Sequence, residues 1–203
     1  MPYHLPDGYV RNDPAYGVTL FGEQLRVWPP EEVYLRATRV ARDLGVGTIV
    51  DVGCGGIGAL KPWGDEFQIV GVDCDDSLRW APFGWQCIPA DLDAPDPLPE
   101  MEVPAVWVVG GVIERLGHPE HLVRALGERL GGGNVVVLST PDRERVRGHM
   151  HNGPCPVLPH VQEWTLDELT GWLAEEGWAI ASATHIRSTD QEPARATCLV
   201  EAA

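Results

Sequence analysis

The chain has 203 residues, 44% of them hydrophobic, and its 15 basic and 30 acidic side chains give a net charge of −15. This length can bury one self-sufficient core, so we expect a single domain over 1–203, with an irregular N-terminal arm at 1–30 and the core at 31–203. The acidic balance argues against a nucleic-acid partner, because basic side chains must neutralise a phosphate backbone. Without a membrane-length apolar run or a signal peptide, we expect a cytoplasmic protein that has no membrane partner.

Helical and strand-like patterns alternate along the chain. Apolar residues at helical spacing predict helices over 33–44, 119–130 and 165–177, the last beginning at a capping box. Apolar runs without polar alternation predict buried strands at 48–52, 68–73, 86–89, 105–109 and 134–139. Two further strands, 178–186 and 195–201, should pair antiparallel. This order predicts an α/β fold with a doubly wound, mainly parallel sheet, whose ligands bind beyond the carboxyl ends of the strands.

A glycine-rich loop follows the first predicted strand. Gly53, Gly55 and Gly58 make a GxGxxG pattern, and Asp73 lies 73 − 53 = 20 residues after the first glycine. This spacing is typical of a dinucleotide site, with the glycines at the phosphates and the acid at the ribose. An NAD-linked oxidoreductase is therefore one interpretation, and a purely structural turn is another.

Carboxylates after three successive strands favour a different nucleoside. Asp51 stands at the end of the first strand, where a cationic methionyl group would find a counter-charge and a dinucleotide would need none. Asp73 follows the second strand and would bind the ribose hydroxyls. Asp91 and Asp93 follow the third and would meet the adenine amino group. Together these positions predict S-adenosylmethionine as the ligand.

The segments VDVGCGG, VGVD, PADLD and VVGGVIERLGHPEHLVRALGERLGGGNVVVLSTPDR resemble class I S-adenosylmethionine-dependent methyltransferases. The resemblance runs from about residue 31 to the C-terminus and implies a Rossmann-like, seven-stranded sheet that ends in an antiparallel hairpin. The arm and the stretch 151–169 are similar to a bacterial subgroup associated with glycans or secondary metabolites. By this resemblance the cofactor-binding residues are Asp51, Gly53, Cys54, Gly55, Asp73, Cys74, Asp91, Leu92 and Gly110.

Several positions depart from the family pattern. The third glycine is displaced to Gly58, and Pro62 should shorten the helix that follows the loop. Arg115 stands where many relatives have histidine, and Ala105 where many have an acid, which disfavours a metal-dependent scheme. Gly110 begins a GGVI segment in place of an NPPY tetrapeptide, which disfavours amino-directed nucleobase, glutamine or DNA enzymes.

Histidines between the fifth strand and the last helix are the candidates for proton transfer. A hydroxyl acceptor must lose its proton, and a neutral imidazole can accept it near physiological pH. We predict His160 as the general base, with His151 second, and a small-molecule or glycan-like acceptor. A metal held by these two and His149 is an alternative, but no carboxylate spacing supports it, so no metal is predicted.

Three further expectations concern the rest of the chain. The basic residues at 143, 145 and 147 either contact an anionic acceptor or are solvated loop charges, and Tyr16 and Trp28 either close over the site or pack in the core. The five scattered cysteines lack a CxxC pair, which indicates reduced thiols. A non-catalytic module that binds S-adenosylmethionine remains the third functional interpretation.

Overall fold

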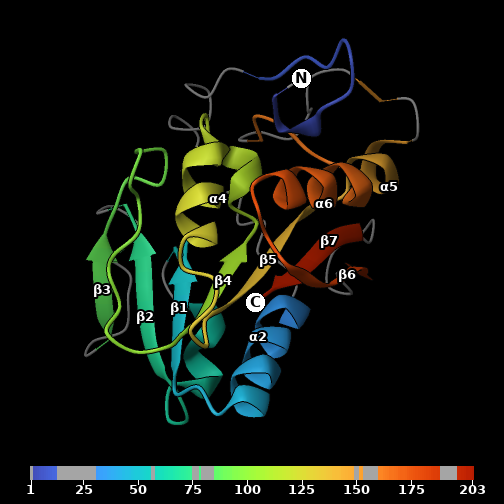
Figure 1. Ribbon diagram of the computed structural model, residues 1–203. Helices are drawn as coiled ribbons and strands as arrows, with labels where there is room; N and C mark the ends of the chain where they lie inside the picture. Colours follow the sequence, from blue (N-terminus) through green and yellow to red (C-terminus); the bar gives the residue numbers. More distant parts are fainter. Residues whose placement is uncertain are drawn as a thin grey trace.

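The computed structural model of the chain describes residues 2–12, 31–55, 58–74, 78, 85–148, 151–152, 160–187 and 196–203 (Figure 1). The α-helices are α2 (Glu31–Leu44), α4 (Pro119–Gly127), α5 (Arg143–Arg147) and α6 (Leu166–Glu175), and the 3-10 helices are η1 (Pro2–His4), η2 (Gly58–Trp63) and η3 (Ile113–Arg115). The strands are β1 (Thr48–Val52), β2 (Gln68–Asp73), β3 (Gln86–Pro89), β4 (Val106–Gly110), β5 (Val135–Pro141), β6 (Ile180–Arg187) and β7 (Ala196–Ala202). None of the helices in these ranges has the length and hydrophobicity of a membrane span.

The strands form one seven-stranded sheet in the order β3-β2-β1-β4-β5-β7-β6. Strands β1 to β5 pair in parallel, whereas β7 runs antiparallel to both β5 and β6. The winding direction reverses between β1 and β4, and ligands of such sheets bind beyond the carboxyl ends at this point. The predicted fold, a mainly parallel seven-stranded sheet with an antiparallel C-terminal hairpin, is confirmed.

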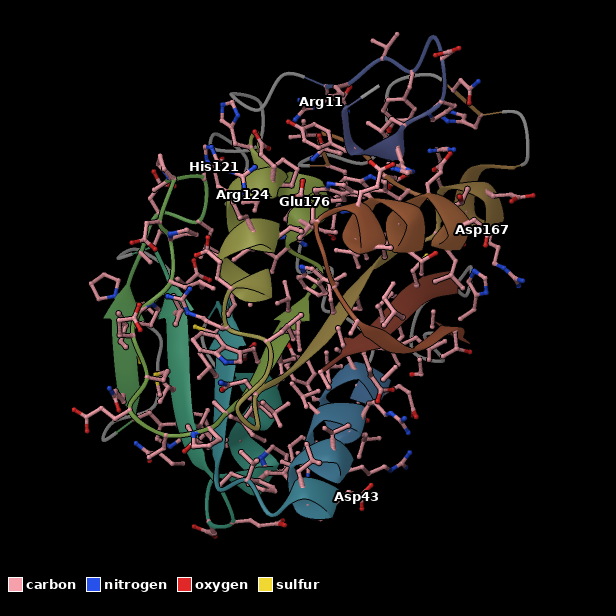
Figure 2. All side chains as sticks on the ribbon, in the orientation of Figure 1. Arg11, Asp43, His121, Arg124, Asp167 and Glu176 are labelled. Atoms are coloured by element: carbon pink, nitrogen blue, oxygen red, sulfur yellow. The ribbon has the colours of Figure 1, made fainter. Side chains whose placement is uncertain are left out.

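Apolar clusters cover both faces of the sheet, because alternate strand residues point to opposite sides. Val50 and Val52 of β1 belong to the cluster that contains the buried faces of α4 and α6, and Ile49 belongs to the one under α2. Figure 1 shows α4 and α6 side by side and α2 apart from them. An ion pair also links the two neighbouring helices, with Arg124 Nε 3.9 Å from Glu176 Oε2 (Figure 2).

The observed elements agree with the predicted ones in order, and some of their limits differ. The helix predicted over 119–130 ends at Gly127, after which Arg129 and Leu130 donate their N–H groups to carbonyls three residues back. This tighter pattern is the usual 3-10 end of an α-helix. The expectation of a buried strand at 86–89 is wrong, because β3 is the edge strand and is partly exposed along its length. As predicted, the segment with Pro62 forms only the short helix η2.

The described part of the N-terminal arm packs on α6 and on the turn before α4. The Tyr3 carbonyl accepts a hydrogen bond from Trp164 Nε1 at 2.9 Å, and the Tyr3 ring lies edge-on to Trp172. Arg11 (Figure 2) donates from Nη2 to the Gly117 carbonyl at 2.6 Å. Residues 2–12 therefore cover the same edge of the sheet at which the candidate site lies. Tyr16 and Trp28 lie outside the described residues.

Candidate active site

The loop after β1 is held against the segment that follows β4. Gly53 has a φ of 71° and donates its N–H to the Val72 carbonyl of β2 at 2.8 Å. A Cβ at this position would lie 2.4 Å from Cγ2 of Val112. Only glycine satisfies both the left-handed backbone and this close approach. The contact fixes the position of the glycine loop relative to β4.

Asp73, the last residue of β2, ties the glycine loop to the second strand. Its Oδ2 accepts a hydrogen bond from the Gly55 N–H, and its Oδ1 accepts one from the Cys74 N–H, both at 2.7 Å. Apart from its chain neighbours, no described residue has a heavy atom within 4 Å of a Cβ built on Gly55, so the main chain is open toward the described part of the protein there. Because a carboxylate oxygen can accept a second hydrogen bond, Asp73 retains the capacity to bind ribose hydroxyls.

Asp51 is a buried acid without a partner. Its side chain is 1% exposed, and neither carboxylate oxygen has a hydrogen-bond partner among the described residues. Burial, and secondarily the nearby Asp73 carboxylate, raises the pKa of Asp51 to about 8. A buried polar group with no partner is costly, and such groups mark the places where a ligand completes the structure.

Ser139 is a second unpaired polar group on the same face of the sheet. It is fully buried, pairs with Gly110 across β4 and β5, and its Oγ has no partner among the described residues. Asp51 pairs with Val108, which in turn pairs with Val137, two residues before Ser139. Side chains two apart on a strand share a face. The two orphaned groups therefore flank β4 at its carboxyl end, which suits a ligand with a polar, cationic end.

The acids after β3 have different surroundings from one another. Asp91 is exposed, and its Oδ1 accepts the Asp93 N–H at 3.0 Å, while Leu92 between them is buried. Asp93 accepts hydrogen bonds from the N–H groups of Gly117 and His118 at 3.2 and 2.7 Å. The Asp93 carboxylate thus holds the turn that begins α4, and its contact with a nucleoside stays a prediction. The roles of Asp91 and Leu92 at the cofactor stay predictions.

The other predicted cofactor residues lie just after β1, just after β2 and at the last position of β4. Cys54 is buried beside Asp51, and burial raises the pKa of its thiol. Cys74 follows Asp73 and is exposed, and Gly110 is buried at the end of β4. Cys54, Cys74, Cys87 and Cys198 are all reduced.

His160 lies in a buried group of carboxylates beyond β4 and β5. Its imidazole is 1% exposed, with Nδ1 2.7 Å from Glu163 Oε1 and Nε2 3.8 Å from Glu114 Oε1. Glu114 accepts a further hydrogen bond from Thr140 Oγ1 at 3.0 Å, and its carbonyl accepts the Val161 N–H at 2.7 Å. Both ring nitrogens therefore face acids that belong to different segments.

The N-terminal arm bonds the main chain at or next to both predicted histidines. Asn12 Nδ2 donates to the His160 carbonyl at 2.9 Å, and Val10 N–H donates to the carbonyl of Asn152, next to His151. His151 is half-buried, and its Nδ1 has no partner among the described residues. The arm therefore contacts the main chain at His160 and next to His151. His149 lies outside the described residues.

Arg143 is neither a solvated charge nor an anion site. It is 6% exposed, donates from Nη1 to the Glu163 carbonyl at 3.0 Å and forms an ion pair with Glu168. It therefore connects the α6 capping box to the segment that carries His160. Arg145 is exposed, and its main-chain N–H binds the capping Asp142. The side chain of Arg147 lies outside the described atoms.

Sequence reasoning missed three of the side chains that surround the site: Glu114, Ser139 and Glu163. The HVQE spacing places Glu163 three residues after His160, which could have indicated a pair. Ser139 at the end of an apolar strand could also have been singled out. Glu114 is 46 residues from His160 in the chain, and no local pattern connects them.

A mainly parallel sheet with a glycine loop, a ribose-type carboxylate and an unpaired buried acid at its central carboxyl edge defines a class I methyltransferase fold. Residues 30–183, about three quarters of the chain, match the family described as "Methyltransferase domain". The chain belongs to this family and is an S-adenosylmethionine-dependent methyltransferase. S-adenosylmethionine is its cofactor, and the NAD-linked alternative is set aside.

Solved structures with the same fold come from several kinds of protein. The glycopeptide N-methyltransferase MtfA with S-adenosylhomocysteine has a TM-score of 0.62 at 16% identity, covering 90% of this chain and 89% of that one. The [4+2]-cyclase SpnF has a TM-score of 0.62 at 13% identity, covering 96% and 86%. The O-methyltransferase NcsB1 from neocarzinostatin biosynthesis, with S-adenosylmethionine and 2-hydroxy-5-methyl naphthoic acid, has a TM-score of 0.57 at 19% identity, covering 84% and 54%. Among curated proteins none matches the sequence.

Proposed function

We propose that the protein methylates a hydroxyl group of a small-molecule or saccharide acceptor, with His160 as the group that accepts the hydroxyl proton. The observation that carries this proposal is the position of the imidazole between Glu163 and Glu114, beyond the carboxyl ends of β4 and β5 in the sheet that carries the cofactor loops. A hydroxyl acceptor must transfer its proton to a base, and the proposal depends on this transfer. An amine acceptor would not require the transfer in the same way.

The residues present fit the cofactor. The unpaired carboxyl group of Asp51 suits the methionyl ammonium, Asp73 suits the ribose hydroxyls, and the open main chain at Gly55 allows close approach. The remaining proposed contacts are Gly53, Cys54, Cys74, Asp91, Leu92 and Gly110. When bound, S-adenosylmethionine supplies a sulfonium methyl group for in-line displacement, so much of the rate enhancement comes from holding the acceptor in line.

The Glu163–His160 pair can prepare the imidazole as a base. A carboxylate at Glu163 accepts a hydrogen bond from Nδ1–H at 2.7 Å, which leaves the lone pair on Nε2. Glu114 then lies 3.8 Å from Nε2, near enough to stabilise the imidazolium that forms. Since the ring is 1% exposed, an acceptor reaches Nε2 only after the segments packed around the ring rearrange.

The class of acceptor is supported by charge and by the neighbours. The net charge of −15 disfavours a polyanionic substrate such as a nucleic acid. One solved neighbour is a glycopeptide N-methyltransferase, and another is an O-methyltransferase in complex with a naphthoic acid. The net charge and the two neighbours are both compatible with a small or saccharide-like acceptor.

Substitution of His160 by glutamine tests the proposed base. With a panel of hydroxylated acceptors and a labelled methyl donor, we expect the rate to fall at least about 100-fold, because proton transfer typically contributes 10²–10⁴-fold. The affinity for S-adenosylhomocysteine, measured by calorimetry, should be unchanged. His118→Gln is the matched control, since the His118 side chain is 64% exposed.

Two outcomes would overturn the proposal. Full activity of His160→Gln would show that the imidazole is only a structural part of the buried cluster. A methyl group located on nitrogen or carbon of the product by NMR would remove the hydroxyl acceptor.

Substitution of Asp73 by asparagine tests the ribose assignment. We expect the affinity for S-adenosylhomocysteine to fall at least tenfold, because an amide nitrogen replaces one acceptor of the ribose hydroxyls and of the loop N–H groups. Asp96→Asn, at an exposed position of the loop after β3, is the control. Unchanged affinity in a folded Asp73→Asn protein would place Asp73 outside the site.

A further inference from the structure

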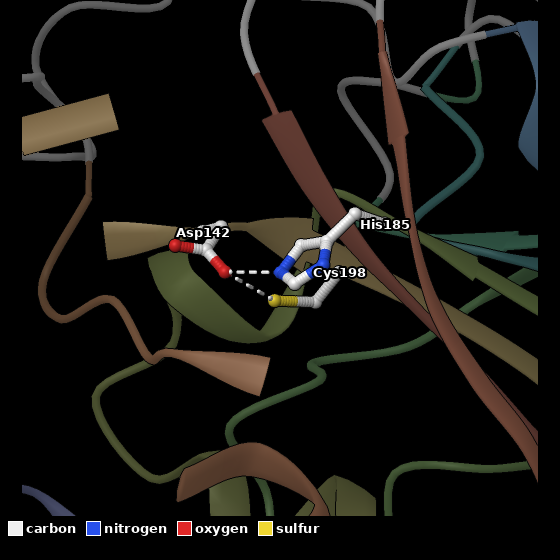
Figure 3. Close-up of side chains that lie close together, drawn as sticks. All are labelled: Asp142, His185 and Cys198. Atoms are coloured by element: carbon white, nitrogen blue, oxygen red, sulfur yellow. Dashed lines mark hydrogen bonds and ion pairs between the residues drawn. The ribbon is translucent and has the colours of Figure 1, made fainter. Parts of the chain in front are cut away.

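A second group of side chains with ligand chemistry lies at the other end of the sheet's carboxyl edge (Figure 3). Asp142 follows β5 and caps α5, His185 lies on β6 and Cys198 on β7. His185 and Cys198 are direct cross-strand partners, and Cys198 also pairs with Thr140, two residues before Asp142. The sheet register therefore brings the three side chains together, although His185 and Cys198 are 43 and 56 residues from Asp142 in the chain.

The distances place one nitrogen, one sulfur and one oxygen around a common point. Asp142 Oδ2 lies 2.6 Å from His185 Nε2 and 3.5 Å from Cys198 Sγ, and the three atoms all lie within 4.8 Å of one another. In a tetrahedral zinc site with bonds of about 2.0–2.3 Å, ligand atoms are about 3.3–3.7 Å apart. A small opening of the Asp142–His185 contact would therefore admit an ion.

Asp142 is held in a way that leaves one oxygen for a ligand. Its Oδ1 accepts the Arg145 N–H at 2.8 Å, so the helix cap occupies Oδ1 and orients Oδ2 toward His185 and Cys198. Asp142 and Cys198 are 2% and 0% exposed. A ligand oxygen that is oriented by a second hydrogen bond is typical of metal sites.

A cavity opens beside the group. It has a volume of about 410 Å³ and is lined by Asp142 and His185 together with Glu144, Arg145, Thr165 and Asp167. Its wall carries three carboxylates and one guanidinium and is therefore acidic. This charge favours entry of a cation. Cys198 lies behind this wall, so an ion held by the three atoms would have its remaining coordination position on the cavity side.

We propose that Asp142, His185 and Cys198 bind one zinc ion, with a fourth position open to the cavity for water or a small anionic or neutral ligand. The mixed sulfur, nitrogen and oxygen set suits zinc better than magnesium or calcium, which prefer oxygen ligands alone. The group is unsuited to thiol catalysis, because the Cys198 thiol is fully buried and donates to the Asp142 carboxylate. This site is separate from the cofactor loops on β1 and β2.

Titration of the full chain, without an added histidine tag, tests the proposal. After dialysis against a chelator, calorimetry with zinc chloride should show one ion per chain. Cobalt should give the near-ultraviolet thiolate-to-cobalt charge-transfer band. Cys198→Ser should abolish this band and weaken zinc binding at least about 100-fold, because loss of an outer partner alone often costs 10–100-fold.

Further variants distinguish loss of the zinc site from unfolding of the protein and from a change at the cofactor site. Cys87→Ser changes a partly exposed thiol on the opposite edge strand and should leave both signals intact. His185→Gln alters a side chain that is 26% exposed, so it should fold even if Cys198→Ser does not, and it should also lose zinc. All three variants should bind S-adenosylhomocysteine like the parent. Zinc affinity that is absent in the parent, or equal to the parent's in Cys198→Ser and His185→Gln, would overturn the proposal.

Discussion

Gly53→Ala is expected to destabilise the protein by about 2–5 kcal/mol and to weaken cofactor binding at least tenfold. A left-handed backbone costs a non-glycine residue about 1–2 kcal/mol, and overpacking a well-filled site costs about 1–3 kcal/mol. Both apply here, because φ is 71° and the new Cβ would lie 2.4 Å from Val112 Cγ2. Chemical denaturation gives the change in stability, and calorimetry with S-adenosylhomocysteine gives the change in affinity.

A double-mutant cycle separates the cost of the left-handed backbone from the cost of the steric contact with Val112. Val112→Ala removes the methyl groups that the new Cβ at position 53 would meet, so adding it to Gly53→Ala should recover part of the lost stability relative to the sum of the single changes. Gly47→Ala is the control, since Gly47 precedes β1, has no positive φ and, its chain neighbours apart, has no atom of a described residue within 4 Å of a Cβ built there. Strict additivity of the two substitutions would contradict the proposed steric contact.

Asp51→Asn is expected to have opposite effects on binding and on stability. On the proposed role, the substitution removes the counter-charge of the methionyl ammonium, and loss of one partner from a buried charge pair costs about 2 kcal/mol or more. The affinity for S-adenosylhomocysteine should therefore fall at least about 30-fold. The free protein, in contrast, should gain stability at pH 8, because an unpaired buried carboxylate is replaced by a neutral amide of similar shape.

The direction of the expected stability change follows from the pH dependence of the free energy of unfolding. The folded pKa of Asp51 is raised to about 8, so between the ordinary value of about 3.9 and 8 the folded protein keeps a proton that the unfolded chain has lost. Raising the pH through this window should lower the free energy of unfolding by about 1.4 kcal/mol per unit for this group. Asp51→Asn removes the dependence, so its stability should match the parent near pH 4 and exceed it at pH 8.

Asp43→Asn is the matched control for charge, because Asp43 lies on the exposed end of α2 (Figure 2). It should leave both the affinity and the pH profile unchanged. Equal stability of Asp51→Asn and the parent at every pH would show that Asp51 is paired or hydrated in the free protein. Unchanged cofactor affinity would place the carboxyl group outside the binding site.

Three groups of functional side chains thus lie one after another along the carboxyl edge of the sheet. The loops after β1 and β2 form the proposed cofactor end, the buried group of His160, Glu114 and Glu163 lies beyond β4 and β5, and the proposed zinc ligands lie at β6 and β7. The arm at 2–12 touches the middle one, through Asn12 and His160.

The sequence by itself determined the order of the elements and the cofactor end of the site. Uninterrupted apolar strands indicate a sheet covered on both faces, and Gly53, Gly55, Asp51 and Asp73 are adjacent to strand ends that must meet at one edge of a parallel sheet. These features are local, since each depends on residues within one strand and the loop that follows it. The exposed edge strand β3 was mispredicted for the same reason, because its short apolar run does not reveal which neighbours it lacks.

Only the tertiary structure decided which side chains share a buried space. It engaged Asp93 with the start of α4, buried Arg143 against Glu168 and left Asp51 without a partner among the described residues. It also joined His160 to Glu114, and Asp142 to His185 and Cys198, across separations of 43 to 56 residues. Such pairings depend on sheet register and on the packing of helices over it. No periodicity within a single segment predicts these long-range pairings.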